Sequence, residues 1–354
     1  MFTWTETPLT EMWHQLRYLR SPANVRNLLS GQIISCRTPM RSSDSELDKR
    51  SREIASCIRQ ADEYYKAADT VGLATHPLLQ FYGAECLAKA VVLANNSSIL
   101  LSNINYHGLT TRANTAADSS DKKRLQAYSN DSSIWRIEDE FAVTNQGVFL
   151  ELCKTIGESE QCVGTVLKLK NLFKILPDLD NLYRRHYSEN SNCFYLYSNP
   201  RKSSEGKVTI YFDRREDIPD IAAVFPEFIS SFVEDEMTFG EQVTARGFIS
   251  KEPMDLPLTF GAVHEGTVGG RYFIRPLECG LKESFSVIFA AMFILSNVVR
   301  YKPAFWMEQL EGNSSGSASL AEALCNLAKR RLPNEALNAI WHEEFTYGTP
   351  GRLS

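Results

Sequence analysis

Pro77-Leu-Leu-Gln-Phe-Tyr-Gly-Ala-Glu-Cys-Leu-Ala-Lys-Ala-Val-Val-Leu93 has the clearest helical pattern in the chain. Proline suits the first turn of a helix, because the amide that it lacks would have no partner there, and the apolar residues after it repeat at helical spacing. Gly83 and Ala84 are small enough to let a second helix approach closely. The polar run Asn95-Asn96-Ser97-Ser98 is predicted to end the helix.

A long helix is predicted just before this segment. Ser43-Asp44-Ser45-Glu46 has the pattern of a capping box, in which the hydroxyl and the carboxylate each accept a hydrogen bond from an otherwise unpaired backbone amide. An apolar stripe continues to about Thr70, and Gly72 is placed to end the helix in a left-handed turn. An antiparallel helix pair is therefore the predicted core of the N-terminal half.

The middle of the chain favours strands. The runs 194–197 and 208–212 are rich in β-forming residues and flank a turn-rich loop, which predicts a hairpin, with further strands at 248–249, 256–260 and 271–274. A last turn is predicted at 266–270.

The C-terminal third returns to helical spacing. We expect a strongly apolar helix over 281–302, another helix capped by Ser319-Leu-Ala-Glu322, and a last helix that begins at Asn334. The predicted fold is mainly α with a small antiparallel β insertion (α+β). It divides into a helical region over 1–189, a β-rich insertion over 190–280, and helices over 281–354 that pack on the N-terminal region.

Composition limits the functional classes. The 354 residues include 38 Lys and Arg against 43 Asp and Glu, a net charge of −5, so the chain as a whole does not favour nucleic acid or anionic membranes. None of the eight cysteines has Cys-x-x-Cys spacing, which argues against a zinc site or a redox pair. The apolar run Phe285–Val299 is shorter than the roughly 20 residues that a bilayer requires. We expect a cytoplasmic protein with no cofactor, metal or membrane partner.

Three groups of residues carry a family resemblance. They are Ala61-x-x-Tyr64-Tyr65-x-x-Ala68 with the helix that follows it, the isolated His107-Gly108-Leu109, and Leu295-Ser-x-x-x-Arg300-Tyr301-x-Pro303-x-x-Trp306. In this order they resemble the bacterial YaaC-like family over nearly the whole chain. The helix pair followed by His-Gly is also similar to HEPN-type helical domains, so the resemblance implies a HEPN-like helical core. Many HEPN domains are ribonucleases or nucleic-acid-associated modules in microbial conflict systems.

The usual HEPN ribonuclease motif is absent. That motif has four to six residues between an arginine and a histidine on one helix, and none of the six histidines has an arginine five to seven positions before it. Arg184-Arg185-His186 comes nearest, but adjacent residues point to different faces of a helix. His107 remains the candidate catalytic residue of a non-standard site.

A composite anion site is the sharpest prediction. Lys89 lies in an apolar helix and Arg300 near the end of another, and buried cations need a partner. If both helices pack with these ends together, the His107-Gly108 loop could fold over them, and the three cationic side chains would bind an anion such as phosphate. In the alternative interpretation, Lys89 and Arg300 reach solvent or pair with Glu85 and Glu283, and His107 is structural.

A second basic group lies at the predicted hairpin. Arg201, Lys202, Arg214 and Arg215 flank strands that carry several aromatic residues, an arrangement that can bind single-stranded nucleic acid. The alternative is a solvated hairpin whose aromatic rings belong partly to the core.

We therefore expect a non-catalytic binding or assembly component, in antiphage defence or nucleic-acid-linked regulation, with a protein partner or a second copy of the chain and with nucleic acid as a further partner. The alternative is a metal-independent ribonuclease with its site around His107. Whether the chain is an enzyme stays open at this point.

Overall fold

A computed structural model gives the structure of the chain. It describes residues 2–35, 43–213, 216, 218–239, 242–254, 262–265, 271–311 and 316–348. The fold is mainly helical with antiparallel sheets, which confirms the predicted α+β class. The chain forms two compact units, one of residues 1–169 with 283–354 and the other of residues 170–282.

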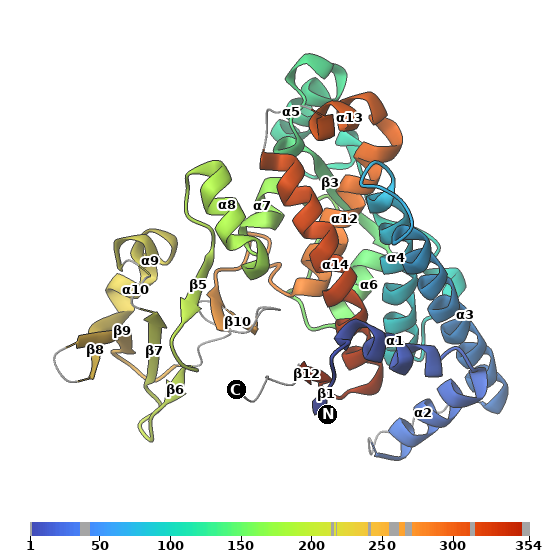
Figure 1. The fold of residues 1–354 in the computed structure, drawn as a ribbon, viewed down its shortest axis with the longest axis horizontal. Helices are drawn as coiled ribbons and strands as arrows, with labels where there is room; N and C mark the ends of the chain where they lie inside the picture. Colours follow the sequence, from blue (N-terminus) through green and yellow to red (C-terminus); the bar gives the residue numbers. More distant parts are fainter. Residues whose placement is uncertain are drawn as a thin grey trace. The chain divides into compact units, whose positions relative to one another are not determined.

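Helix α4 (His76–Asn95) lies at the centre of the first unit. It packs against α3 (Asp44–Ala68), α12 (Ser284–Tyr301) and α14 (Gly316–Trp341), as Figure 1 shows. Helix α4 has Pro77 in its first turn and ends at the predicted asparagines.

Close packing of α3 and α4 depends on a glycine. A Cβ atom on Gly83 would lie 2.6 Å from the ring of Tyr65 on α3, which confirms that this small residue permits the approach of the two helices. The capping box of Ser43 and Glu46 is also present at the start of α3. The predicted left-handed turn at Gly72 is wrong, because α3 ends at Ala68 in a right-handed turn and the chain enters α4 through further turns.

The most apolar helices owe their composition to burial. Both α4 and α12 are long and apolar enough to cross a membrane by length and composition, but 78% of each qualifying window is buried inside the protein. The core helix of a soluble protein passes the same test, and burial against neighbouring helices accounts for the apolar composition of both.

Helix α14 corrects two predictions. Ser319 does not cap a helix, because α14 begins at Gly316 and Ser319 lies inside it. The last helix does not begin at Asn334, because α14 continues without a break through Pro333. A proline inside a helix removes one backbone hydrogen bond. Here Leu332, Pro333 and Leu337 are buried, and their packing offsets that loss.

Smaller elements surround these helices. Strands β2 (His107–Thr110), β3 (Phe141–Gly147) and β4 (Val166–Lys168) form an antiparallel sheet, and β1 (Phe2–Trp4) pairs in parallel with β12 (Thr346–Gly348). The remaining helices of this unit include α1 (Pro8–Tyr18), α2 (Pro22–Ser35), α5 (Ser119–Asn130), α6 (Val148–Thr155) and α13 (Pro303–Glu311).

The second unit contains the β-rich segment. Its strands follow the spatial order β10 (Ala262–Glu265), β11 (Arg271–Ile274), β5 (Cys193–Leu196), β7 (Val208–Asp213), β9 (Gln242–Ser250) and β8 (Phe232–Phe239), with β6 (Arg201–Lys202) on β7. Its helices are α7 (Leu169–Lys174, whose first residue belongs to the other unit), α8 (Asp180–Tyr187), α9 (Ile218–Val224) and α10 (Pro226–Ser231). The predicted hairpin is confirmed by the pairing of β5 with β7. The predicted strand 256–260 and the turn 266–270 lie outside the described residues.

Candidate functional site

Two of the predicted site residues meet on one buried carboxylate. Glu85, on α4, has a side chain that is only 6% exposed, and its Oε1 lies 2.9 Å from Nζ of Lys89, one helical turn later. The same oxygen lies 3.0 Å from Nδ1 of His107, on β2. The structure therefore brings Lys89 and His107 together, with Glu85 as the group that joins them.

The two basic groups keep Glu85 ionised. Burial alone would raise the pKa of this carboxyl, but the contact with His107 and the charge of Lys89 outweigh burial and lower the pKa below its ordinary value. A carboxylate paired with Lys89 already forms a neutral set, so this cluster does not need an exogenous anion.

Gly108 and two phenylalanines position His107. The backbone of Gly108 has φ +78°, and a Cβ there would lie 2.6 Å from the amide nitrogen of Phe149, so only glycine fits. The rings of Phe81 and Phe293 pack against the imidazole at centroid distances of 5.5 and 5.9 Å. His107 therefore lies on a strand, not in the predicted loop, and its side chain remains 35% exposed.

Arg300 lies in a different group of contacts. Its guanidinium stacks over Tyr82 at 5.4 Å and over Tyr301 at 5.2 Å, and Tyr82 in turn stacks on Tyr64 at 5.5 Å. We call Tyr64, Tyr82, Arg300 and Tyr301 the aromatic ladder. Tyr82 precedes Lys89 by seven residues, about 10 Å along the helix. Arg300 thus lies beside the first half of α4, about two turns from Lys89.

The basic hairpin is only partly described. Arg201 and Lys202 form β6, opposite Thr209 and Val208, and both side chains are exposed. Arg214 and Arg215 lie outside the described residues. Phe212 is fully buried, so at least one of the aromatic rings near the hairpin belongs to the core.

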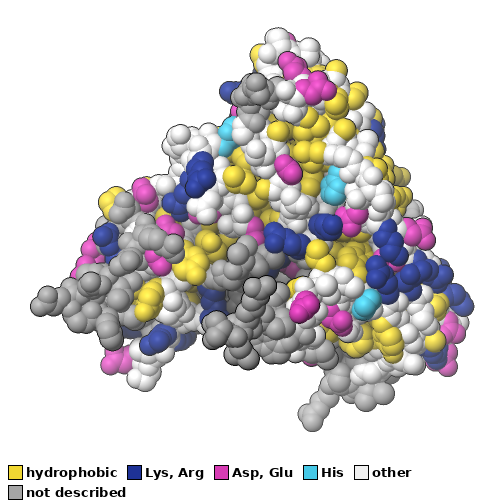
Figure 2. Space-filling model, in the orientation of Figure 1, with side chains coloured by type: hydrophobic (Ala, Val, Ile, Leu, Met, Phe, Trp, Pro, Cys, Tyr) yellow, Lys and Arg dark blue, Asp and Glu magenta, His cyan; other side chains and the backbone are white. Residues whose placement is uncertain are grey.

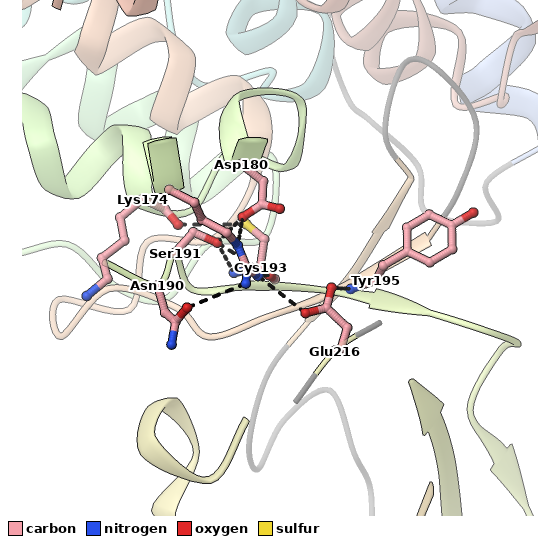
Figure 3. A network of polar contacts seen from close by, with 8 residues as sticks. Lys174, Asp180, Asn190, Ser191, Cys193, Tyr195 and Glu216 are labelled. Carbon is pink, nitrogen blue, oxygen red and sulfur yellow. Dashed lines mark hydrogen bonds and ion pairs between the residues drawn. The ribbon is translucent and has the colours of Figure 1, made fainter. Parts of the chain in front are cut away.

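A buried polar network in the second unit was not predicted from the sequence. Arg184 donates hydrogen bonds to Asp180 (2.7 Å) and to the carbonyl of Cys193 (2.9 Å), and it contacts Glu216 at 3.4 Å. Ser191 also bonds to Asp180 (Figure 3). Burial raises the pKa of Glu216 in spite of the backbone amide of Tyr195 and the charge of Arg184. The network joins α8 to β5, and both of its carboxylates accept hydrogen bonds from other groups of the network, which indicates a structural role.

A second unpredicted cluster surrounds Asp62 on α3. Its buried carboxylate accepts hydrogen bonds from Arg17 (3.0 Å), Arg20 (3.2 Å) and Lys66 (2.7 Å). The only signal in the sequence is the spacing of Asp62 and Lys66 by one helical turn, because Arg17 and Arg20 lie more than forty residues away.

Among the residues that the structure describes, no group of three or more His, Cys, Asp or Glu side chains could hold a metal ion.

Comparison with protein families identifies the family of this chain. The chain matches the YaaC-like protein family over residues 17–340, and it belongs to that family. No curated protein and no solved structure matches the chain.

Proposed function

We propose that this YaaC-like protein is a non-catalytic binding or assembly component in antiphage defence or nucleic-acid-linked regulation. The observation that carries the proposal is that the buried Glu85 carboxylate contacts both Lys89 and His107 and balances the charge of Lys89. A composite anion site would require positive charge in excess of its internal partner, and Glu85 already balances the charge of Lys89. The setting in defence or regulation rests on the resemblance of the helix pair and the His-Gly motif to HEPN-type domains.

The aromatic ladder supports the binding role. Tyrosine and arginine are, with tryptophan, the residue types enriched among the few residues that carry most of the binding energy of a protein interface. Tyr301 at the outer end of the ladder is 65% exposed, and Arg300 beside it has no carboxylate partner among the described residues. A partner protein or a second copy of the chain would stack on these groups.

One observation favours a ribonuclease as the second candidate. His107 is partly exposed and its Nδ1 faces an ionised, buried Glu85, an arrangement that can orient an imidazole as a general base. In a ribonuclease of this kind, Lys89 could contact a phosphate only if its ammonium broke the ion pair with Glu85.

Incubation with RNA separates the two candidates. Purified protein is mixed with total RNA and with tRNA, with and without divalent metal, and the products are resolved on a denaturing gel. We expect intact RNA for the wild type and for His107→Ala. Cleavage that is lost in His107→Ala but retained in Glu151→Gln, a surface control, would overturn the non-catalytic role.

A further inference from the structure

The cluster around Asp62 has more positive charge than its own carboxylate can balance. Arg17, Arg20 and Lys66 all contact this one side chain, which is 2% exposed. Burial would raise the pKa of Asp62, but hydrogen bonds from Arg17 and Lys66 and their charges hold it below its ordinary value, so the carboxylate stays ionised. Three cations against one anion leave two positive charges in excess.

Glu11 on α1 offsets one of the two excess charges, and the other neighbouring charges come in balanced pairs. Lys329, on α14, pairs at 2.7 Å with Asp69, the residue after α3, so this pair adds one charge of each sign. Arg59 and Glu63 on the same helix also add one charge of each sign. Figure 2 shows Lys and Arg side chains gathered where Figure 1 places α1 and α3. The surface is thus locally basic in a chain whose net charge is −5.

The cations of this cluster are fixed in place but keep donors for a ligand. Arg17 uses Nε and Nη2 on Asp62, and Arg20 uses Nη1, so each guanidinium retains N–H groups that do not face the carboxylate. The side chains of Arg20 and Lys66 are 39% and 57% exposed. Asp62 therefore acts as a buried anchor that orders the cations, which lowers the entropy cost of binding a phosphate.

An aromatic side chain lies within this basic segment. Tyr18, between Arg17 and Arg20 in sequence, is half exposed, and its ring packs against Trp341 at a centroid distance of 6.1 Å, tilted by 37°. A supported tyrosine beside arginines is the combination by which proteins hold single strands, because the base stacks on the ring while the cations contact the backbone phosphates.

We infer that Arg17, Arg20, Lys66 and Tyr18 form a binding site for single-stranded nucleic acid. The inference deepens the proposed binding role by assigning a ligand and a surface to it. The site lies on α1, on the turn that follows it and on α3, and none of its residues belongs to the Glu85 cluster or to the aromatic ladder.

The test uses fluorescence anisotropy of a labelled oligodeoxythymidylate with the full chain. This DNA has no 2′-hydroxyl group, so a metal-independent ribonuclease could not cleave it. Binding is compared between wild type and an Arg20→Gln, Lys66→Gln double variant, which removes the charge excess but keeps Arg17 on Asp62. The matched control is Arg26→Gln, because Arg26 is similarly exposed but lies between Asp44 and Asp48. Circular dichroism verifies that each variant is folded.

We expect the double variant to bind roughly tenfold more weakly at low salt. The slope of the logarithm of the affinity against the logarithm of the salt concentration should be smaller in magnitude by about 1.4, the value for two single-strand phosphate contacts. Tyr18→Ala should weaken binding by about fivefold or more, and Arg26→Gln should bind as wild type does. Equal affinity of the wild type and the double variant, or no binding by wild type at low salt, would overturn the inference. Displacement of the DNA by polyglutamate as readily as by unlabelled DNA would also overturn it, in favour of an acidic protein ligand.

The outcomes distinguish this inference from the proposed function. Absence of DNA binding by the wild type, or equal binding by the wild type and the double variant, refutes the nucleic-acid site but leaves a non-catalytic role with another partner. Cleavage of RNA through His107 refutes the non-catalytic role but leaves the DNA measurement unaffected.

Discussion

Replacing Glu85 by glutamine would remove the charge that joins Lys89 to His107. A buried ion pair that loses one partner costs about 3–5 kcal/mol, because the other charge remains in a poorly solvated position. Lys89 and His107 are 20% and 35% exposed, so both regain some hydration. We therefore expect Glu85→Gln to lower the free energy of unfolding by about 2–3 kcal/mol.

Urea unfolding followed by circular dichroism measures this change. Glu151→Gln is the matched control, because Glu151 on α6 pairs at 2.9 Å with Lys154, whose side chain is 61% exposed. A surface pair of this kind contributes about 0–1 kcal/mol, so the control should unfold nearly as wild type does. A loss below about 1 kcal/mol in Glu85→Gln, or equal losses in both variants, would refute the interpretation of Glu85 as the centre of a buried charge cluster.

The pH dependence of stability tests the same interpretation of Glu85 independently. The pKa of Glu85 is lower in the folded protein than its ordinary value of 4.5, so the stability from ionised Glu85 is fully present above that value. This stability is lost as the pH falls through the lowered folded pKa. The difference between wild type and Glu85→Gln should therefore shrink on acidification below about pH 4.5. A difference that grows on acidification would contradict the assignment.

Three further predictions concern packing and burial. Gly83→Ala should destabilise the protein by about 1–3 kcal/mol through overlap with the neighbouring tyrosine, whereas Gly31→Ala, with open space around it in α2, should be neutral or stabilising in the same urea titration. Burial raises the pKa of the Cys86 thiol to about 12, so iodoacetamide should alkylate Cys86 at least about a hundredfold more slowly than the exposed Cys162, as peptide mass spectrometry would show. Lys302→Met should lower the free energy of unfolding by about 3 kcal/mol in thermal or urea unfolding. The ammonium of Lys302 lies 2.6 Å from the buried carboxylate of Glu140, and the substitution leaves that carboxylate without its cation.

Local chemistry made much of the helical core predictable. The capping box of Ser43 and Glu46 and the proline in the first turn of α4 act through neighbouring atoms, so their residue pattern is sufficient. Gly83 indicated close helix packing because few other reasons favour glycine inside such an apolar helix. The hairpin of β5 and β7 followed from two β-rich runs separated by turn residues.

Tertiary contacts decided the features that the sequence did not reveal. Gly72 was expected to end α3, but the helix ended earlier, in a right-handed turn that requires no glycine. The chain was expected to restart a helix after Pro333, but burial of its neighbours keeps α14 continuous. Asp62 accepts hydrogen bonds from arginines that are distant in sequence, and a periodic residue pattern does not predict such a contact.

The candidate site was also predictable only in part from the sequence. Sequence reasoning named Lys89 and His107, and it named Glu85 as one partner that would make Lys89 structural. Helix direction determined the position of Arg300, which stacks beside Tyr82 instead of joining the other cations. Composition and spacing give the apolar faces of two helices but not which ends meet.

The most direct test of the central claim is to observe the His107 imidazole by NMR in protein labelled with nitrogen-15 at histidine. Inorganic phosphate and a ribodinucleotide are titrated at constant ionic strength, and His107→Ala identifies the resonances. Because Glu85 already neutralises this cluster, the His107 ring signals should show no saturable shift with either ligand. A saturable shift that disappears in Lys89→Met would contradict the account, since it would show that Lys89 and His107 bind a phosphate together.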